Sequence, residues 1–516
     1  MESKNEITEQ LNRILKEDRV LTDIEDRYVY SFEKIFEKPA YPAPNIVVKV
    51  FSLEEEEEIS KLAEKEGFLL IKRGKKLTPS LITGARSIIM VDDVKVPELA
   101  VIKESIENHS GITETIKNIH RNPLNTRLNR ALALKHLFSG KTTYKCHECT
   151  TCSDYCTVNA SFNGIETWSS RGRALLIRGM MRGEINVSNK IADILYTCTK
   201  CGLCFSKCSQ DLDLYKAIAA TRHLLAEKNM VPQVFHDVAK NITEYGDPSG
   251  EQVTRRFSWL KKISSSDRPA KADVLYWVGC TVASRTPRTA NAFFNILNSA
   301  NIDFTMLNEE EGCCGYVLHS AGLLNEAREI ARGVLEKVRT TGAKTLVTPC
   351  AGCYYTFNTL YPEDLDVSLP FKILHSSQFI EQMMNSGEIT LDNPINASVT
   401  YHDPCSLGRH AKVYQAPRNV LSAIKGLEIT EMPLNRDFSR CCGGGGGLWT
   451  FNSQTSMEVA ETRLKEDFAK TDVDMLITAC PQCQMNIRFA SRKKDFPVKI
   501  SDITEIVEAA LTIEKS

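Results

Sequence analysis

Long apolar runs are missing from this sequence, and nowhere does it approach the ~20 consecutive apolar residues that a membrane-spanning helix needs. Its first 18 residues are polar and charged, unlike a secretory signal peptide. Neither sign of charge dominates, because 64 Lys and Arg oppose 65 Asp and Glu. This balance gives no general attraction to nucleic acid or to an anionic membrane surface. We therefore expect a cytoplasmic chain that reaches a membrane only through a partner subunit.

Cysteine is abundant, with 18 residues in a chain of 516. A chain of this length predicts three or four domains of roughly 100–200 residues. Many cysteines in a small secreted protein indicate disulfides, but here they stand as CxxC and CC groups in a large chain without a signal peptide. Metal ligation is therefore the better interpretation.

Two motifs share the spacing Cx2Cx2Cx3C: Cys146, Cys149, Cys152, Cys156 and Cys198, Cys201, Cys204, Cys208. In two-cluster ferredoxins the first three cysteines bind one cubane and the fourth binds the other. We therefore expect one [4Fe–4S] cluster on Cys146, Cys149, Cys152, Cys208 and a second on Cys198, Cys201, Cys204, Cys156. Structural zinc is the alternative, but zinc ribbons use two CxxC pairs and need no third cysteine. Thr157 and Ser209 replace the proline that often follows the fourth cysteine.

The stretch between these motifs is basic and helical in pattern, with Arg171, Arg173, Arg178 and Arg182. These arginines form a solvated face in one interpretation. In the other they lie near an anionic cluster or bind an acidic partner.

A repeat follows over residues 273–385 and 396–508. Each copy has an apolar strand leading to a cysteine, then Cys-Cys-Gly, then a second strand ending in CxxC. The cysteines are Cys280, Cys313, Cys314, Cys350, Cys353 in the first copy and Cys405, Cys441, Cys442, Cys480, Cys483 in the second. Alternating strands and helices predict two α/β units with parallel strands. The cysteines would lie at the carboxyl ends of the strands, beside helix N-termini that favour anionic thiolates.

Both copies fit the pattern CxnCCGxnCxxC, and the stretches YHDPCSLGRH (401–410) and RCCGGGGG (440–447) strengthen the match. Residues 141–508 thereby resemble the catalytic-subunit family of membrane-associated heterodisulfide reductase, and more loosely the iron–sulfur subunits of glycolate, lactate and glycerol-3-phosphate oxidases. The resemblance implies that each five-cysteine motif holds a noncubane [4Fe–4S] cluster at which a disulfide is split. Adjacent cysteines such as Cys313 and Cys314 suit two neighbouring irons better than one.

Other residues near these motifs are candidates for auxiliary roles. His402 and His319 could donate protons or hydrogen-bond a cluster sulfur, or could be histidines satisfied by the backbone. Arg409 and His410 could bind an anionic substrate group or lie on the surface. The glycines 443–447 would let the backbone approach a cluster closely.

The amino-terminal region reads as α/β, with strands at 46–50, 68–71 and 87–91 and a helix at 52–66. Residues 20–92 resemble the first half of the FAD-binding domain of 2-hydroxyacid oxidases. Lys75, Lys76 and Leu77 follow Gly74 in place of a Gly-rich pyrophosphate loop, and the second half of that domain is missing. We therefore expect no FAD in this chain, and a docking role for this domain.

The expected organisation is a multidomain α/β chain. Its expected parts are an FAD-oxidase-like domain (1–95), a helical connector (96–140), a ferredoxin-like domain (141–230), a linker (231–272) and the two repeat domains (273–385, 396–508).

Two functions follow. One is a disulfide-reducing or thiol-oxidising subunit acting on a small disulfide or thiol. The other is an electron carrier between a flavin dehydrogenase and a quinone or haem acceptor. Expected partners are other redox subunits: a flavoprotein, a subunit of hydrogenase or formate dehydrogenase type, or a membrane haem or quinone subunit.

Overall fold

The computed structural model describes residues 2–15, 19–30, 46–50, 53–66, 69–72, 87–92, 146, 149–262 and 269–512. They form two compact units. The first comprises Met1–Asp154 and Phe162–Ile194, and the second Tyr155–Ser161 and Leu195–Ser516. Among the described residues, no helix is both long and apolar enough to cross a bilayer.

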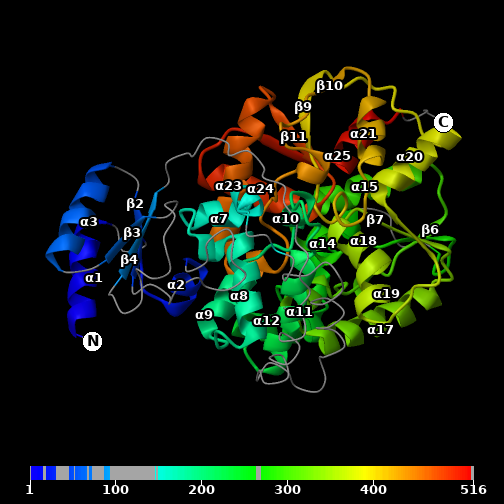
Figure 1. The fold of residues 1–516 in the computed structure, drawn as a ribbon. Helices are drawn as coiled ribbons and strands as arrows, with labels where there is room; N and C mark the ends of the chain where they lie inside the picture. Colours follow the sequence, from blue (N-terminus) through cyan, green and yellow to red (C-terminus); the bar gives the residue numbers. More distant parts are fainter. Residues whose placement is uncertain are drawn as a thin grey trace. The chain divides into compact units, whose positions relative to one another are not determined.

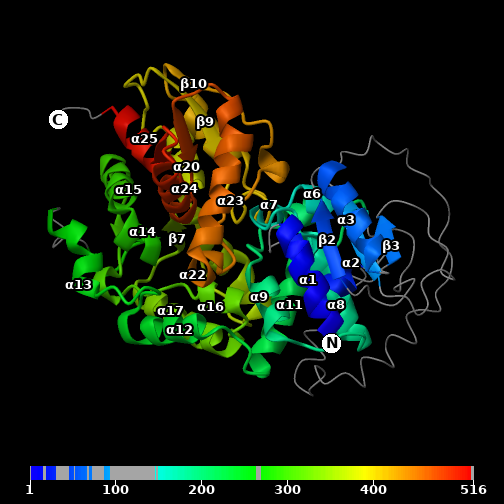
Figure 2. The ribbon, with the colours of Figure 1, turned by 90° about the vertical axis from the view of Figure 1, so that its left-hand side faces the viewer.

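The first unit contains a four-stranded sheet in the order β1-β2-β4-β3. Its strands are β1 (Val20–Leu21), β2 (Ile46–Val50), β3 (Leu69–Lys72) and β4 (Ser87–Asp92). Both β2 and β3 pair parallel to β4. Helices α1 (Glu2–Ile14) and α3 (Leu53–Lys65) cover one face of this sheet (Figures 1 and 2). The α/β prediction for this region is confirmed. Residues 75–77, which were expected to replace a pyrophosphate loop, lie outside the described residues.

Helical segments complete the first unit. They are α2 (Ile24–Tyr30), α6 (Thr151–Asp154), η4 (Glu166–Trp168), α8 (Ser170–Arg182) and most of α9 (Asn189–Tyr196). The Tyr30 hydroxyl accepts a hydrogen bond from Glu166 N at 2.9 Å, which links α2 to η4. The amino-terminal region and the segment 162–194 therefore share one packed unit.

The solvated-face interpretation of α8 is wrong. Arg171, Arg173 and Arg178 are at most 1% exposed. Arg171 pairs with Glu166 at 3.1 Å, and Arg173 Nε donates to Ile194 O at 2.9 Å. The polar sequence alone suggested that these arginines are exposed to solvent. Guanidinium groups can nevertheless be buried when carboxylates and carbonyls accept their hydrogen bonds.

The second unit begins with a short helix directly after the first ferredoxin motif and continues with helices that carry or follow the second motif. They are α7 (Thr157–Ser161), α10 (Leu203–Ser206), α11 (Leu214–Glu227), α12 (Gln233–Tyr245), α13 (Val253–Arg256) and η5 (Ser258–Lys262). The segment expected as a linker thus contains α12, which buries Phe235, Val238 and Ile242. These residues are three and four positions apart, the spacing of a buried helix face. Helix α12 thus contributes to the core of the second unit.

Two four-stranded parallel sheets follow, as predicted from the repeat. The first has the order β6-β5-β7-β8: β5 (Val274–Tyr276), β6 (Phe304–Thr305), β7 (Thr345–Thr348), β8 (Lys372–His375). The second has the order β10-β9-β11-β12: β9 (Ala397–His402), β10 (Leu427–Ile429), β11 (Met475–Thr478), β12 (Lys499–Asp502). The two sheets have the same strand order, so the copies share one topology.

Helices connect the strands within each copy (Figure 1). Those of the first copy include α14 (Cys280–Arg285), α15 (Pro287–Ser299), α16 (Tyr316–Ala321), α17 (Leu324–Thr340), α18 (Ala351–Tyr355), η8 (Thr356–Leu360), α19 (Tyr361–Asp364) and α20 (Ser376–Ser386). Those of the second include α21 (Gln415–Ser422), α22 (Leu448–Phe451), α23 (Ser453–Glu466), α24 (Pro481–Lys493) and α25 (Ile503–Ala510).

The last helix of each copy is capped by a buried side chain at the end of the last strand. His375 Nδ1 accepts a hydrogen bond from Ser377 N at 3.1 Å, and Asp502 Oδ1 accepts one from Thr504 N at 2.9 Å. Burial lowers the pKa of His375 to about 4 and raises the pKa of Asp502 to about 7. The two copies thus use one cap position with groups of opposite acid–base character.

Candidate iron–sulfur sites

The first five-cysteine group (Cys280, Cys313, Cys314, Cys350, Cys353) gathers beyond the carboxyl ends of β5 and β7. Cys280 begins α14, and Cys350 caps α18. The Sγ atoms of Cys280 and Cys313 are 4.0 Å apart, and those of Cys314 and Cys353 are 3.5 Å apart. The parallel sheet therefore brings distant cysteines of one repeat into contact.

Hydrogen bonds among these thiols favour a thiolate at one position. Bonds from Cys313 and Cys353 hold the pKa of Cys314 well below that of an ordinary thiol. Bonds with neighbouring thiols, followed by burial, raise the pKa of Cys313 and Cys353. All of these cysteines are free thiols in the structure. Such a buried donor set suits a cationic centre, which replaces the remaining protons on binding.

The second five-cysteine group (Cys405, Cys441, Cys442, Cys480, Cys483) repeats this arrangement. Cys441 hydrogen-bonds with Cys405 and Cys442. Cys442 hydrogen-bonds in turn with Cys483, and these bonds hold the pKa of Cys442 well below its ordinary value. Cys480 occupies the N-cap position of the 13-residue helix α24, so the N-terminus of that helix lies beside the group.

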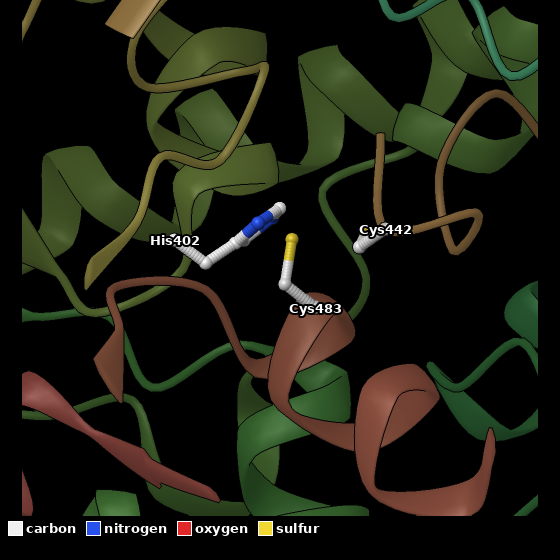
Figure 3. A group of neighbouring side chains, drawn as sticks. All are labelled: His402, Cys442 and Cys483. Atoms are coloured by element: carbon white, nitrogen blue, oxygen red, sulfur yellow. The ribbon is translucent and has the colours of Figure 1, made fainter. Parts of the chain in front are cut away.

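His402 belongs to this second group. Ligand atoms of His402, Cys442 and Cys483 all lie within 4.8 Å of one another. Figure 3 shows His402 at the end of β9 and Cys483 at the start of α24 pointing toward each other. Burial lowers the pKa of His402, whereas Cys442 beside it opposes this shift. The equivalent position of the first copy, three residues before the first cysteine, is Trp277.

His319 has a different environment. It lies in α16, and its Nε2 atom is 2.8 Å from Asp364 Oδ2. A carboxylate thus orients this ring, whereas the ring of His402 faces thiols. The role in proton donation or in hydrogen bonding to a cluster stays a prediction for both residues.

Backbone N–H groups point at sulfur in both groups. Gly315 N donates to Cys313 Sγ at 3.4 Å, and Gly443 N donates to Cys441 Sγ at 3.3 Å. Gly444 N donates to Cys442 Sγ at 3.4 Å. Amide hydrogen bonds to sulfur are a means by which proteins stabilise cluster-bound thiolates. The residues present therefore fit an iron–sulfur cluster at each group.

The two ferredoxin-type motifs are divided between the units. Cys146, Cys149 and Cys152 lie in the first unit. Cys156 lies in the second unit, as do residues 198–208, which we call the dicluster loop. Within that loop, Lys200 N donates to Cys198 Sγ at 3.3 Å, and Lys200 and Gly202 adopt positive φ. The expected exchange of Cys156 and Cys208 between two clusters stays a prediction.

The dicluster loop touches the second five-cysteine group directly, a contact that was not predicted. The side chains of Cys201 and Cys441 interact, and this interaction holds the pKa of the Cys201 thiol well below its ordinary value. No sequence signal identified this pair, because 240 residues separate the two cysteines. The contact places a predicted cubane ligand beside a ligand of the second repeat.

Arg222 holds the dicluster loop in this arrangement. It is fully buried, and its guanidinium donates to Leu195 O and Cys198 O at 2.7 Å. It also donates to Ser320 O of the first repeat and to Gly446 O of the second, at 2.8 and 2.6 Å. One side chain thus joins the dicluster loop to both repeats.

The glycine run 443–447 has a role that differs in part from the expected one. A Cβ atom at Gly446 would lie 2.3 Å from Thr199 C and 2.8 Å from Cys198 O. These glycines therefore admit the backbone of the dicluster loop, besides donating N–H groups to their own cysteines. The glycine run was visible in the sequence, but the sequence did not identify the dicluster loop as the segment that packs against it.

Arg409 and His410, considered above as substrate-binding or surface residues, are turned inward. Arg409 is 6% exposed and donates to Cys201 O at 2.7 Å. The His410 ring lies against Tyr215 and Tyr355, and its Nε2 donates to Lys200 O at 3.0 Å. Both residues bind the dicluster loop in this structure.

Comparison with known proteins agrees with these sites. The cysteine-rich (CCG) domain matches residues 274–358 and 399–488, and the 4Fe-4S dicluster domain matches residues 140–212. The fold and the cysteine groups define an iron–sulfur oxidoreductase of the CCG class, and the dicluster domain implies two [4Fe–4S] cubanes.

Individual relatives narrow this class. The chain is 32% identical over 390 residues to one subunit of the dihydromethanophenazine:CoB–CoM heterodisulfide reductase of Methanosarcina barkeri, covering 72% of this chain and 94% of the relative. This chain belongs to the family of that heterodisulfide reductase subunit. It is 28% identical over 320 residues to one subunit of the fumarate reductase (CoM/CoB) of Methanothermobacter marburgensis, with 61% of each chain covered. It is 25% identical over 338 residues to EtfAB:quinone oxidoreductase of Syntrophomonas wolfei, covering 62% of this chain and 47% of that protein.

Proposed function

We propose that this chain is the disulfide-reducing or thiol-oxidising subunit of a larger redox complex. The observation that carries the proposal is that both five-cysteine groups are complete and gathered at the ends of their sheets. Five thiolates exceed the four that a cubane uses, so each group suits a noncubane [4Fe–4S] cluster. When bound, such clusters supply one-electron redox chemistry and iron that accepts substrate sulfur.

The overall reaction balances as a two-electron reduction. The S–S bond of the substrate breaks, two electrons come from a partner subunit, and two protons give two thiols; the reverse process joins two thiols. The dicluster loop beside Cys441 supports electron delivery to the second group. Cubanes bound by four thiolates are coordinatively full, so Cys198, Cys201 and Cys204 would serve electron transfer alone.

A cavity beside the first five-cysteine group supports access for a small molecule. Its volume is about 430 Å³, and Cys313, Gly312 and Arg256 are among the residues that line it. This volume lies within the range of small-molecule sites, roughly 300–1,000 Å³.

An electron carrier is the second candidate function. Similarity to EtfAB:quinone oxidoreductase favours it, because that relative is named as an oxidoreductase between EtfAB and a quinone. The α/β amino-terminal sheet, which resembles half of an FAD-binding domain, would then serve as a docking surface. Flavin absorbance that copurifies with the isolated chain would contradict the expectation that this domain holds no FAD.

The unmodified protein, purified anaerobically, should contain about 16 iron atoms, four for each of four clusters.

Two cysteine variants separate the two candidate functions. Cys442→Ser should keep both cubane EPR signals but abolish disulfide reduction driven by reduced viologen. Cys201→Ala should instead stop reduction by electrons that enter through the dicluster motif.

The outcome that favours the carrier is equally specific. In that case no disulfide or thiol from an anionic panel is turned over, and no thiol perturbs the EPR signal that depends on Cys442. Transfer from partner to acceptor would nevertheless still depend on Cys442. About 8 iron atoms after full reconstitution would remove the clusters of the five-cysteine groups from the proposal altogether.

A further inference from the structure

Arg409 contacts both the dicluster loop and the second five-cysteine group. Its Nε atom donates to Cys201 O at 2.7 Å, and its Nη1 atom donates to Ser439 O at 2.5 Å. Ser439 lies two residues before Cys441. The planar guanidinium therefore bridges the backbone segments that carry the two contacting cysteines.

The guanidinium charge lies in an environment rich in sulfur. Burial alone would lower the pKa of Arg409, but negative charge on Cys201, Cys405 and Cys441 raises it above the ordinary value. Its Nη2 atom is buried and hydrogen-bonds no atom of the described chain. A buried donor of this kind needs an acceptor, and an anionic cluster beside these thiols would supply one.

The first repeat differs at this position. Four residues after its first cysteine stands Ser284, whose hydroxyl donates to Cys280 O at 2.8 Å. The next residue, Arg285, is exposed, whereas its counterpart His410 is buried against the dicluster loop. The two copies thus share one topology, but only the second has a buried guanidinium at this position.

We propose that Arg409 is a positioning residue that holds Cys201 against Cys441 and raises the reduction potential of the clusters bound by these cysteines. The second five-cysteine group is thereby the point at which single electrons pass between the dicluster motif and the repeats. One electron moves in each event, no bond forms or breaks, and the partner subunit supplies the electron. This inference requires the clusters but holds for an enzyme and for a carrier.

The physical reason is the low dielectric around the pair. Reduction adds a negative charge to each centre, and a fixed positive charge nearby stabilises the reduced form. Arginine is suited to the position because its rigid fork donates in two directions at once, which a lysine ammonium on a flexible stem does not reproduce.

The test is an EPR-monitored redox titration of the anaerobic full-length protein. Arg409→Gln should change the ratio of oxidised to reduced cluster at a fixed potential by about tenfold toward the oxidised form, which corresponds to about 59 mV for one electron. Arg409→Lys should keep this ratio within about threefold, because the charge remains, but should alter the magnetic coupling between the two adjacent centres. Arg285→Gln is the matched control and should leave both readings unchanged, because an exposed charge is screened.

Two results would overturn the inference. One is an Arg409→Gln protein with full iron content whose potentials match the unmodified protein. If that variant does not accumulate, Arg409→Lys decides: unaltered magnetic coupling would show that the fork does not hold the two sites together. Neither reading uses disulfide turnover, so failure of the proposed reaction is detected separately with the viologen assay of the unmodified protein.

Discussion

Gly446 offers a direct test of how closely the dicluster loop and the second repeat approach each other. The residue has a φ of +61°, and a Cβ there would lie 2.3 and 2.4 Å from Thr199 C and O. These are backbone atoms, so no side-chain rotation relieves the clash. Gly387 is the matched control, because its φ is +79° and a Cβ there would meet nothing within 4 Å.

The difference between the two variants isolates the clash. Gly387→Ala should cost only the left-handed conformation, about 1–2 kcal/mol. Gly446→Ala should add the cost of overpacking, about 1–3 kcal/mol, for a total of about 2–5 kcal/mol. The clash at Gly446→Ala can be relieved only if the dicluster loop moves. Cys198 and Cys201 should therefore also bind their cluster less well.

The assay is anaerobic urea unfolding of both variants, followed by iron content and EPR. We expect Gly446→Ala to unfold at lower urea than Gly387→Ala and to lose up to about 4 of 16 iron atoms. Equal unfolding midpoints, with full iron content and an unchanged cubane signal in Gly446→Ala, would refute the described approach of the two backbones.

Two further predictions concern buried charged groups. Arg222→Gln should destabilise the second unit by about 3 kcal/mol or more, measured by urea unfolding, because several carbonyls lose their donor; Arg255→Gln, at an exposed position, should have little effect. Burial raises the pKa of Asp502 to about 7, so its contribution to stability is complete below pH 4 and is lost as pH rises through 7. Asp502→Asn, which retains a capping oxygen, should therefore raise the unfolding free energy at pH 8 by up to about 4 kcal/mol and leave it nearly unchanged at pH 4. A parallel shift of the whole pH profile would contradict this assignment.

The repeat was the most predictable part of the fold. Apolar strands that end at Cys280 and Cys405 combine with CxxC segments at Cys350 and Cys480, and this pattern predicts parallel α/β units. The structure confirms both sheets. Local spacing was sufficient because Cys280, Cys350, Cys405 and Cys480 each follow a strand of their own copy.

Contacts between distant segments were not predictable in this way. The bond from Arg222 to Gly446 joins residues 224 positions apart, and hydrophilic patterning gives no sign of such a burial. The same limitation explains Arg171 and Arg173, which are buried although their helix reads as basic and solvated. Position in the tertiary structure, rather than residue type, decides whether an arginine meets solvent.

The depth of the cysteine groups limits when iron can reach them. Eight cysteines of the two repeats are at most 9% exposed: Cys313, Cys314, Cys350, Cys353, Cys441, Cys442, Cys480 and Cys483. The backbone of the dicluster loop closes over the glycine run beside the second group. Iron and sulfide therefore reach the second group most easily before the dicluster loop closes over it. Reconstitution of the folded protein should accordingly refill the second group more slowly than the first, whose Cys313 lines a cavity.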